Sequence, residues 1–259
     1  MIQDIHDIHI VSAPSFSENN YRPYLVIDKP KGLPSAPISD DDTNNALSKA
    51  LELFPELKKV EGKKKCEYGL LHRLDTETDG LILIAASQDF YNYMTTLQAE
   101  DGFIKYYTAI CNIALDNAQK TDGFPAFDKA FGKEPKEGML IESYFRHYGK
   151  GHSCVRPVTE ASGKAALKKM GKAKLYTTKI VSIEKLSLDT CKVVCCISQG
   201  FRHQVRCHLA WAGLPVCGDS LYNFSDKKKA ENLMFSASKI SFEYPRGDLN
   251  SYDRKDTWT

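Results

Sequence analysis

Two short segments concentrate side chains that can carry out acid–base or nucleophilic chemistry. The first, residues 72–80, reads His-Arg-Leu-Asp-Thr-Glu-Thr-Asp-Gly and lies between two apolar runs. It is too long and too charged for a tight hairpin turn, and a polar loop at the edge of a sheet is a usual place for function. A structural role also remains open on these features alone, with Asp75 capping a turn and Arg73 pairing with it.

The second segment, residues 200–208, reads Gly-Phe-Arg-His-Gln-Val-Arg-Cys-His. The pattern predicts a helix over residues 202–212 that ends at Gly213, with Arg202 and Arg206 one turn apart on the same face. Two guanidinium groups on one face repel each other unless an anion lies opposite, either a buried carboxylate or a phosphate. A solvated basic face is the alternative, but it fits poorly with so apolar a helix.

Other chemistries lack their sequence signals. His203 and Cys207 have a metal-ligand spacing, but no further ligands cluster nearby and no Cys-x-x-Cys pair exists, so we expect no metal site. The chain also has no Gly-x-Ser-x-Gly, Gly-x4-Gly-Lys-Ser/Thr or Gly-x-Gly-x-x-Gly motif. These absences argue against a nucleophile elbow and against nucleotide-driven or hydride-transfer chemistry. We therefore expect no cofactor.

Composition predicts a globular protein of the cytoplasm. The 259 residues include 35 basic and 33 acidic side chains, and 42% are hydrophobic, enough for a sizeable core. The longest apolar run, residues 80–86, has the length of a strand rather than the roughly 20 residues of a membrane helix. The first residues do not resemble a secretion signal, so the eight cysteines are expected to be buried thiols in a reducing compartment.

Hydrophobic periodicity predicts an α+β fold with a mixed or mostly antiparallel sheet, because strands outnumber helices and often follow one another directly. Strands are expected over residues 24–27, 68–71, 81–85, 105–111, 139–148, 175–183, 191–197 and 234–244. Helices are expected over residues 44–54, N-capped by Asp42 or Thr43, and over 88–100 and 202–212. We expect one catalytic unit over residues 22–245, with a polar extension at 1–21 and a polar tail at 246–259.

The segment from His72 to Leu81 resembles the His-Arg-Leu-Asp-x-x-Thr-Ser-Gly-Leu signature of RluA-type RNA pseudouridine synthases. Four more blocks fit in the order of that family. They are the Lys-Pro-x-Gly turn at 29–32, the Lys-x-Tyr-x-Ala strand at 105–109, the His-Gln-Val-Arg block at 203–206 with Gly-x-Pro-x-x-Gly-Asp-x-x-Tyr at 213–222, and the closing strand at 233–245.

Two departures from the family pattern stand out. Asp79 replaces the usual serine, and Arg202 stands one position after the arginine of the usual Gly-Arg-Thr-His-Gln, whereas Arg206 is where the family has it. The S4 RNA-binding domain that often precedes such enzymes is too large for residues 1–21. We therefore expect the catalytic domain itself, or a partner, to hold the RNA.

The resemblance implies a pseudouridine synthase fold, with a central sheet, flanking helices and a central cleft. It also implies an isomerase of a specific uridine in ribosomal or transfer RNA, with Asp75 as the catalytic carboxylate. Burial would raise the pKa of that carboxyl group, so we expect a bidentate ion pair with Arg206 that keeps it ionised.

The remaining site residues follow from the same resemblance. Tyr107 is expected to stack on the flipped uracil and to assist proton removal, and Arg73 to fill the space the base leaves. Contacts with the substrate RNA are expected from His72, Lys29, Lys105, Arg202, His203 and Gln204.

Three other interpretations stay open from the residues alone. A nucleoside hydrolase would need a second carboxylate, for which Glu77 and Asp79 are candidates. An RNA-binding protein on the same scaffold would lack the chemistry. A synthase acting on a free nucleoside would not need the lysine clusters at residues 58–59, 63–65, 164–174 and 227–229. We expect an RNA partner, a monomeric chain and no membrane.

Overall fold

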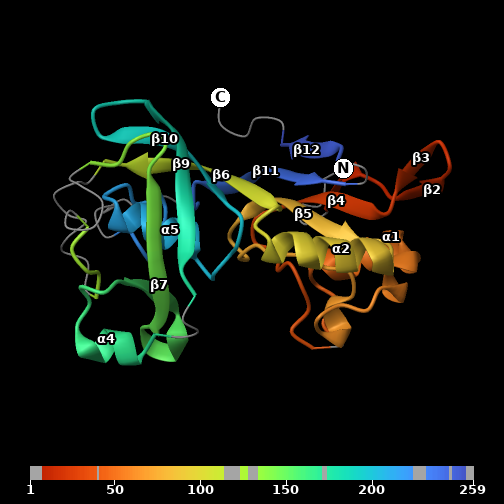
Figure 1. The fold of residues 1–259 in the computed structure, drawn as a ribbon, viewed down its shortest axis with the longest axis horizontal. Helices are drawn as coiled ribbons and strands as arrows, with labels where there is room; N and C mark the ends of the chain where they lie inside the picture. Colours follow the sequence, from red (N-terminus) through yellow and green to blue (C-terminus); the bar gives the residue numbers. More distant parts are fainter. Residues whose placement is uncertain are drawn as a thin grey trace. The chain divides into compact units, whose positions relative to one another are not determined.

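The computed structural model describes residues 8–39, 41–113, 123–127, 134–170, 174–223, 232–244 and 247–254. The chain forms two compact units, whose elements are labelled in Figure 1. Unit 1 comprises Met1–Ile104 and Ser236–Thr259, and unit 2 comprises Lys105–Phe235. The sequence predicted one unit over residues 22–245, because the boundaries fall at strand ends and not in a Gly- or Pro-rich linker.

Unit 1 contains a mixed sheet with the strand order β1-β4-β5-β11-β12. Its strands are β1 (His9–Ser12), β4 (Tyr24–Lys29), β5 (Asp79–Ala85), β11 (Phe235–Glu243) and β12 (Leu249–Asp253). β5 and β11 run parallel, and the other neighbours are antiparallel. A separate hairpin joins β2 (Ser15–Ser17) to β3 (Asn20–Arg22).

The parallel strands β5 and β11 approach closely at Gly80. This residue has a φ of +124°, and a Cβ atom added to it would lie 2.2 Å from the carbonyl oxygen of Ala237. Only glycine has room here, since it adopts positive φ without steric cost and has no side chain to collide. Gly80 thus allows the segment 72–78 to enter the sheet.

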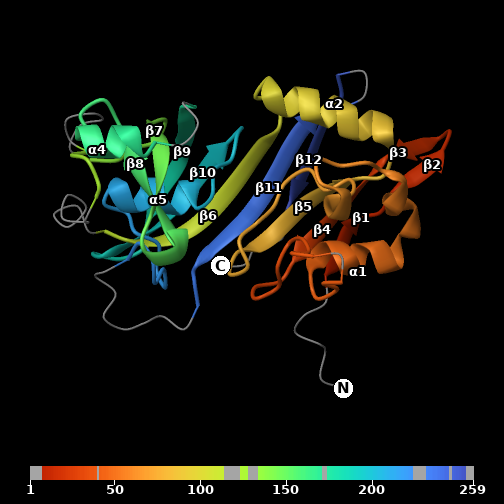
Figure 2. The same ribbon diagram turned by 90° about the horizontal axis from the view of Figure 1, so that it is seen from below.

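Two helices cover unit 1, α1 (Ala46–Leu53) and α2 (Gln88–Ala99), with the 3₁₀ turns η1 (Pro55–Lys59) and η2 (Lys65–Glu67). Figure 2 shows α1 and α2 on opposite sides of β4 and β5. Asn45, not the predicted Asp42 or Thr43, caps α1, since its side chain accepts a hydrogen bond from Ser48 N at 2.9 Å. Ser87 caps α2 in the same way.

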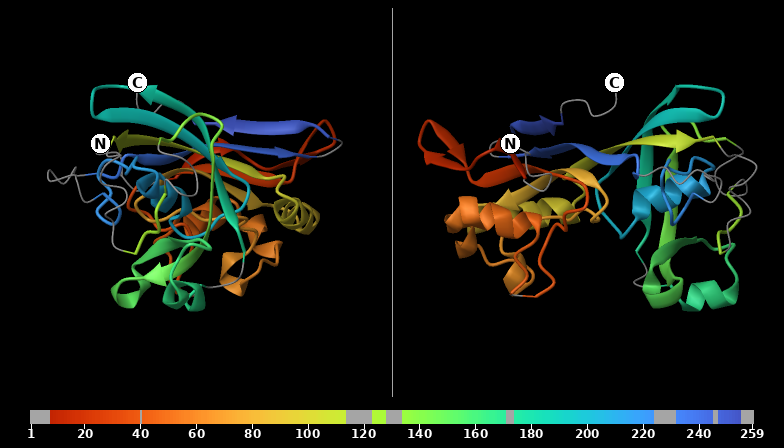
Figure 3. Two further views of the ribbon diagram at one scale, coloured as in Figure 1. Left: turned by 60° about the vertical axis from the view of Figure 1, so that its left-hand side comes forward. Right: turned by 180° about the vertical axis from the view of Figure 1, so that it is seen from behind.

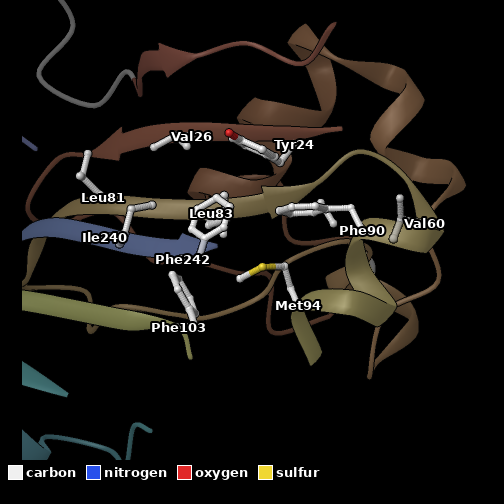
Figure 4. Packing of buried hydrophobic residues seen from close by; sticks show 11 residues of the cluster. Tyr24, Val26, Val60, Leu81, Leu83, Phe90, Met94, Phe103, Ile240 and Phe242 are labelled. Atoms are coloured by element: carbon white, nitrogen blue, oxygen red, sulfur yellow. The ribbon is translucent and has the colours of Figure 1, made fainter. Parts of the chain in front are cut away.

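The core between the sheet and α2 is rich in aromatic rings (Figure 4). Tyr24 stacks on Phe90 with ring centroids 4.8 Å apart, and Phe242 meets both rings edge-on at 5.3 and 5.9 Å. All seven residues of β5 are buried, as expected for a strand with packed faces on both sides. The 72–78 loop therefore ends at a strand that is buried from its first residue.

Unit 2 has an antiparallel sheet with the order β6-β10-β9-β7-β8, seen from two further sides in Figure 3. Its strands are β6 (Ile104–Asn112), β7 (Leu140–Tyr148), β8 (Cys154–Val158), β9 (Tyr176–Lys185) and β10 (Thr190–Ile197). It also contains α4 (Lys164–Lys168), the 3₁₀ turn η4 (Lys150–His152) and α5 (Gln204–Trp211). All eight residues of α5 are buried, and α5 packs on β8 and β9.

Three expectations about secondary structure are corrected. The strand predicted over residues 68–71 is reduced to an isolated bridge between Leu70 and Ile84. The helix predicted over residues 202–212 begins only at Gln204, because His203 has a φ of +56° and cannot continue a right-handed helix. Arg202 therefore does not share a helix face with Arg206. The predicted polar tail contains β12, which pairs with β11 along its whole length, and the predicted extension contains β1 and β2.

Candidate active site

The main chain on both sides of Asp75 is fixed by residues from the turn after β4. Ser35 Oγ donates to the carbonyl of Leu74 at 2.7 Å and accepts from Leu74 N at 2.9 Å. Gly32 N donates to the carbonyl of Thr76 at 2.9 Å. Asp75 itself is half-buried. The residues on either side of it, Leu74 and Thr76, are both anchored by hydrogen bonds.

Lys29 supports the same segment from inside unit 1. It is fully buried, and its Nζ donates to the carbonyls of Pro30 at 2.9 Å, Leu33 at 2.7 Å and Thr76 at 3.2 Å. Burial lowers the pKa of Lys29 to about 8, although the carboxylates of Asp79 and Asp75 oppose this shift. The predicted phosphate contact does not fit this burial, and the contacts instead indicate that Lys29 positions the loop.

His72 and Arg73 precede the anchored residues. His72 Nε2 accepts a hydrogen bond from Leu83 N at 3.0 Å, and its ring meets Phe103 edge-on. Arg73 is exposed, and its guanidinium donates to Glu67 Oε1 at 3.2 Å. Arg73 is thus accessible to a ligand, whereas His72 fastens the loop to β5.

In unit 2, Arg206 forms a buried bidentate ion pair. Its Nε donates to Asp219 Oδ2 at 2.7 Å and its Nη2 to Asp219 Oδ1 at 2.8 Å. Oδ1 also accepts from the backbone N–H groups of Leu221 at 2.9 Å and Tyr222 at 3.1 Å. No role was predicted for Asp219 from the sequence. The Gly-Asp-x-x-Tyr spacing at 218–222 is the signal for an aspartate that caps a turn.

Tyr107 lies on β6 with its ring stacked on Phe235, at a centroid distance of 5.2 Å and an interplanar angle of 4°. Both residues are buried, so Phe235 fixes the plane of the tyrosine ring. Lys105, on the same strand, is also buried, and its Nζ donates to the carbonyl of Ser198 at 2.6 Å. Its role as an RNA contact was predicted, but the structure shows a lysine turned into unit 2.

The three predicted RNA contacts at the start of α5, Arg202, His203 and Gln204, differ in exposure. Arg202 is exposed, and its guanidinium donates to the carbonyl of His152 at 3.0 Å. His203 is buried, with Nδ1 at 3.0 Å from the hydroxyl of Tyr222. Gln204 is buried too, and its amide accepts from Phe201 N at 2.9 Å and donates to the carbonyl of Thr177 at 2.9 Å.

The two residues of the considered metal-ligand spacing, His203 and Cys207, contact other groups, and His203 lies against the hydroxyl of Tyr222. Cys207 Sγ donates to the carbonyl of Val155 at 3.6 Å. His208 lies between the hydroxyls of Ser143 and Thr178, at 2.9 and 2.8 Å, and burial lowers its pKa to about 3. In the part of the chain that the structure describes, no group of three potential ligands could hold a metal ion, and no helix is long and apolar enough to cross a bilayer.

Comparison with known proteins places the chain in a family. Residues 23–211 match the family described as RNA pseudouridylate synthase. The chain therefore belongs to the RNA pseudouridylate synthase family, which confirms the RluA-type resemblance. The match encloses Asp75, Tyr107 and Arg206.

Two curated relatives resemble most of the chain. An uncharacterized RNA pseudouridine synthase of Mycoplasma pneumoniae is 25% identical over 225 residues, covering 85% of this chain and 60% of that protein. The ribosomal large subunit pseudouridine synthase D of Buchnera aphidicola subsp. Acyrthosiphon pisum is 24% identical over 234 residues, covering 88% and 60%. The chain thus spans about three fifths of the length of these relatives.

Two solved human structures share the fold. RNA pseudouridylate synthase domain containing 1 aligns with a TM-score of 0.63 and 18% identity, over 97% of this chain and 84% of that one. RNA pseudouridylate synthase domain containing 4 aligns with a TM-score of 0.57 and 17% identity, over 90% and 85%. These alignments confirm the predicted α+β pseudouridine synthase fold.

Proposed function

We propose that this chain is an RNA pseudouridine synthase in which Asp75 is the catalytic carboxylate. The observation that carries the proposal is the family match over residues 23–211, together with a half-buried Asp75 on a loop whose neighbouring residues are hydrogen-bonded to the turn after β4. A fixed main chain around a reacting group keeps the geometry that a catalytic step requires.

The reaction is an isomerisation and is balanced without a co-reactant. The N1–C1′ bond of a uridine breaks, the uracil turns, and C5 joins C1′. A proton leaves C5 and N1 gains one. In this proposal Asp75 assists departure of the base, and the hydroxyl of Tyr107 helps to remove the C5 proton. The target base leaves its stack before reaction, at a cost of a few kcal/mol, and stacking on an aromatic ring offsets part of it, about 1–3 kcal/mol.

Arg206 is proposed to keep Asp75 ionised. Because its Nε and Nη2 bind Asp219, a contact with Asp75 would have to use the opposite edge of the guanidinium. Asp219 would then orient Arg206 toward the carboxylate of Asp75. A planar guanidinium can bind one carboxylate with two parallel hydrogen bonds along one edge and present its remaining N–H groups to a second carboxylate.

We propose that the substrate is ribosomal or transfer RNA of the cytoplasm. One relative is named a ribosomal large subunit pseudouridine synthase, and all eight cysteines of this chain are free thiols, which suits a reducing compartment. Arg73 and Arg202 are the exposed candidates for phosphate contacts.

The deciding experiment compares Asp75→Asn with Glu77→Gln in cells that lack the native chain. Pseudouridine mapped across total RNA should vanish from at least one position with Asp75→Asn and persist with Glu77→Gln, an exposed neighbour in the same loop. Both proteins should bind that RNA with similar affinity, and binding should weaken as salt rises. Unchanged pseudouridine maps with Asp75→Asn would refute the proposal, and free uracil as a product would favour a hydrolase.

A further inference from the structure

Arg254 joins the C-terminal strand to the end of the loop that carries Asp75. It directly follows β12, and its backbone N–H donates to the carbonyl of Ser238 on β11 at 2.8 Å. Its Nε donates to Asp28 Oδ2 at 2.6 Å, and its Nη1 donates to Asp79 Oδ2 and, at 2.8 Å, to Ser236 Oγ. One guanidinium therefore contacts β4, β5 and β11 together.

The two carboxylates need this cation. The Asp28 and Asp79 side chains are only 18% and 9% exposed, and that of Arg254 is 16% exposed. Burial raises the pKa of Asp28, the ion pair with Arg254 lowers it, and the neighbouring Asp79 raises it. Without Arg254, the two carboxylates, which repel each other, would lose the cation that hydrogen-bonds both of them.

Asp79 is well placed to transmit this contact to the candidate active site. It is the first residue of β5, and it follows a turn in which Thr78 N donates to the carbonyl of Asp75 at 3.0 Å. The segment from Asp75 to Asp79 is thus one hydrogen-bonded unit with a fixed end.

Asp79 stands where the RluA-type signature has serine, and Arg254 lies beyond the residues that match the family, 23–211. A serine at this position would need no cation. The aspartate and the arginine therefore form an ion pair that ties β12 to the loop.

We propose that Arg254 is a positioning residue for Asp75, acting through Asp79, so that this arginine at the end of β12 helps to hold the loop that carries Asp75. The inference rests on the proposed function, since it assumes that Asp75 reacts. Loss of Arg254 lets the start of β5 and the 75–79 turn shift, which misplaces Asp75 without removing any contact to RNA.

The test compares four purified proteins: native, Arg254→Met, Asp79→Ser and the double variant Asp79→Ser/Arg254→Met. Arg254→Met should lower kcat on the RNA identified by the mapping about 10-fold to 100-fold, as expected for a reacting group displaced by about 1 Å, with little change in KM. The double variant should recover most of this loss, because a serine at position 79 removes the repulsion with Asp28 at the start of β5.

Lys239→Met is the matched control. Lys239 pairs with Asp253 of β12 at 3.2 Å on the exposed side of the same two strands, so this variant removes a β12 ion pair without touching Asp79. Its kcat should stay at the native value. An Arg254→Met protein with native kcat, or a double variant as slow as Arg254→Met, would overturn the inference.

Hydrogen–deuterium exchange separates this inference from the proposed function. The amides of residues 74–80 should exchange faster in Arg254→Met than in native protein and Lys239→Met, and return toward native rates in the double variant. If the native chain makes no pseudouridine in any RNA, the proposed function fails on its own, and the exchange rates still report whether Arg254 holds the loop. Native exchange rates in Arg254→Met would overturn the positioning role directly.

Discussion

Arg206 binds Asp219 through two parallel hydrogen bonds, with Nε and Nη2 at 2.7 and 2.8 Å from the carboxylate oxygens. The side chains of the two residues are 6% and 0% exposed, so neither charge is compensated by water. Asp219 also caps the turn at 221–222 through two backbone N–H groups. The orientation of the family arginine is therefore set within unit 2, independently of any substrate.

Replacing Asp219 by asparagine should destabilise the protein strongly, because it leaves the buried guanidinium of Arg206 without a counter-charge. We expect a loss of about 3–5 kcal/mol in the free energy of unfolding, measured by urea denaturation. Asp253→Asn is the control, since its pair with Lys239 is exposed and should contribute at most about 1 kcal/mol. Equal losses in the two variants would contradict the structure.

Gly80→Ala should be more harmful than Gly32→Ala. Both glycines have positive φ, +124° and +78°, but only at Gly80 would a Cβ collide, 2.2 Å from the carbonyl oxygen of Ala237, whereas nothing lies within 4 Å of one at Gly32. We expect Gly32→Ala to cost about 1 kcal/mol of strain and Gly80→Ala to cost about 2 kcal/mol more by forcing β5 from β11. Thermal unfolding of the two variants checks this order.

His208 should make the native chain sensitive to acid. Burial lowers its pKa from 6.5 to about 3, so between these values the unfolded chain binds a proton that the native chain does not. Stability is therefore lost as the pH falls, by about 2 kcal/mol from this group between about pH 7 and about pH 4.5. The loss should shrink in His208→Gln, which keeps a polar partner for Ser143 and Thr178, but not in the exposed His147→Gln.

Lys29 should make the free energy of unfolding depend on pH in the alkaline range. Because its pKa falls from 10.5 to about 8 in the folded chain, the native state releases this proton before the unfolded state does as the pH rises. Its contribution to stability therefore increases between about pH 8 and about pH 10.5, by up to a few kcal/mol. The difference in free energy of unfolding between native and Lys29→Met should grow in this window, and Lys58→Met, at an exposed position, should show no such trend.

The elements that follow from local patterns were well predicted. The helix expected over residues 88–100 is α2 (Gln88–Ala99), because its apolar stripe and Ser87 cap are encoded locally. The strands around Leu81 and Tyr107 were also predicted, since a run of apolar or β-branched residues needs no distant partner to be recognised. Their residues carry the RluA-type blocks, so the family could be identified from the sequence.

Contacts between distant segments were not predicted. β12 reads Leu-Asn-Ser-Tyr-Asp, and as an edge strand with few apolar residues it gives little signal. Arg254 binds residues more than 170 positions earlier in the chain, a distance that composition does not reveal. The burial of Lys29 and Lys105 was missed for a similar reason, because lysine is rarely fully buried and only their backbone carbonyl partners explain it.

The placement of the cysteines has a practical consequence. Six of the eight thiols are buried, and only Cys66 and Cys196 are partly exposed. Burial also raises the pKa of several of them, to about 11 for Cys191, so they are slow to form the reactive thiolate. Mass shifts after brief alkylation thus distinguish folded molecules, alkylated at most twice, from unfolded ones, alkylated up to eight times. The same measurement checks the folding of every variant.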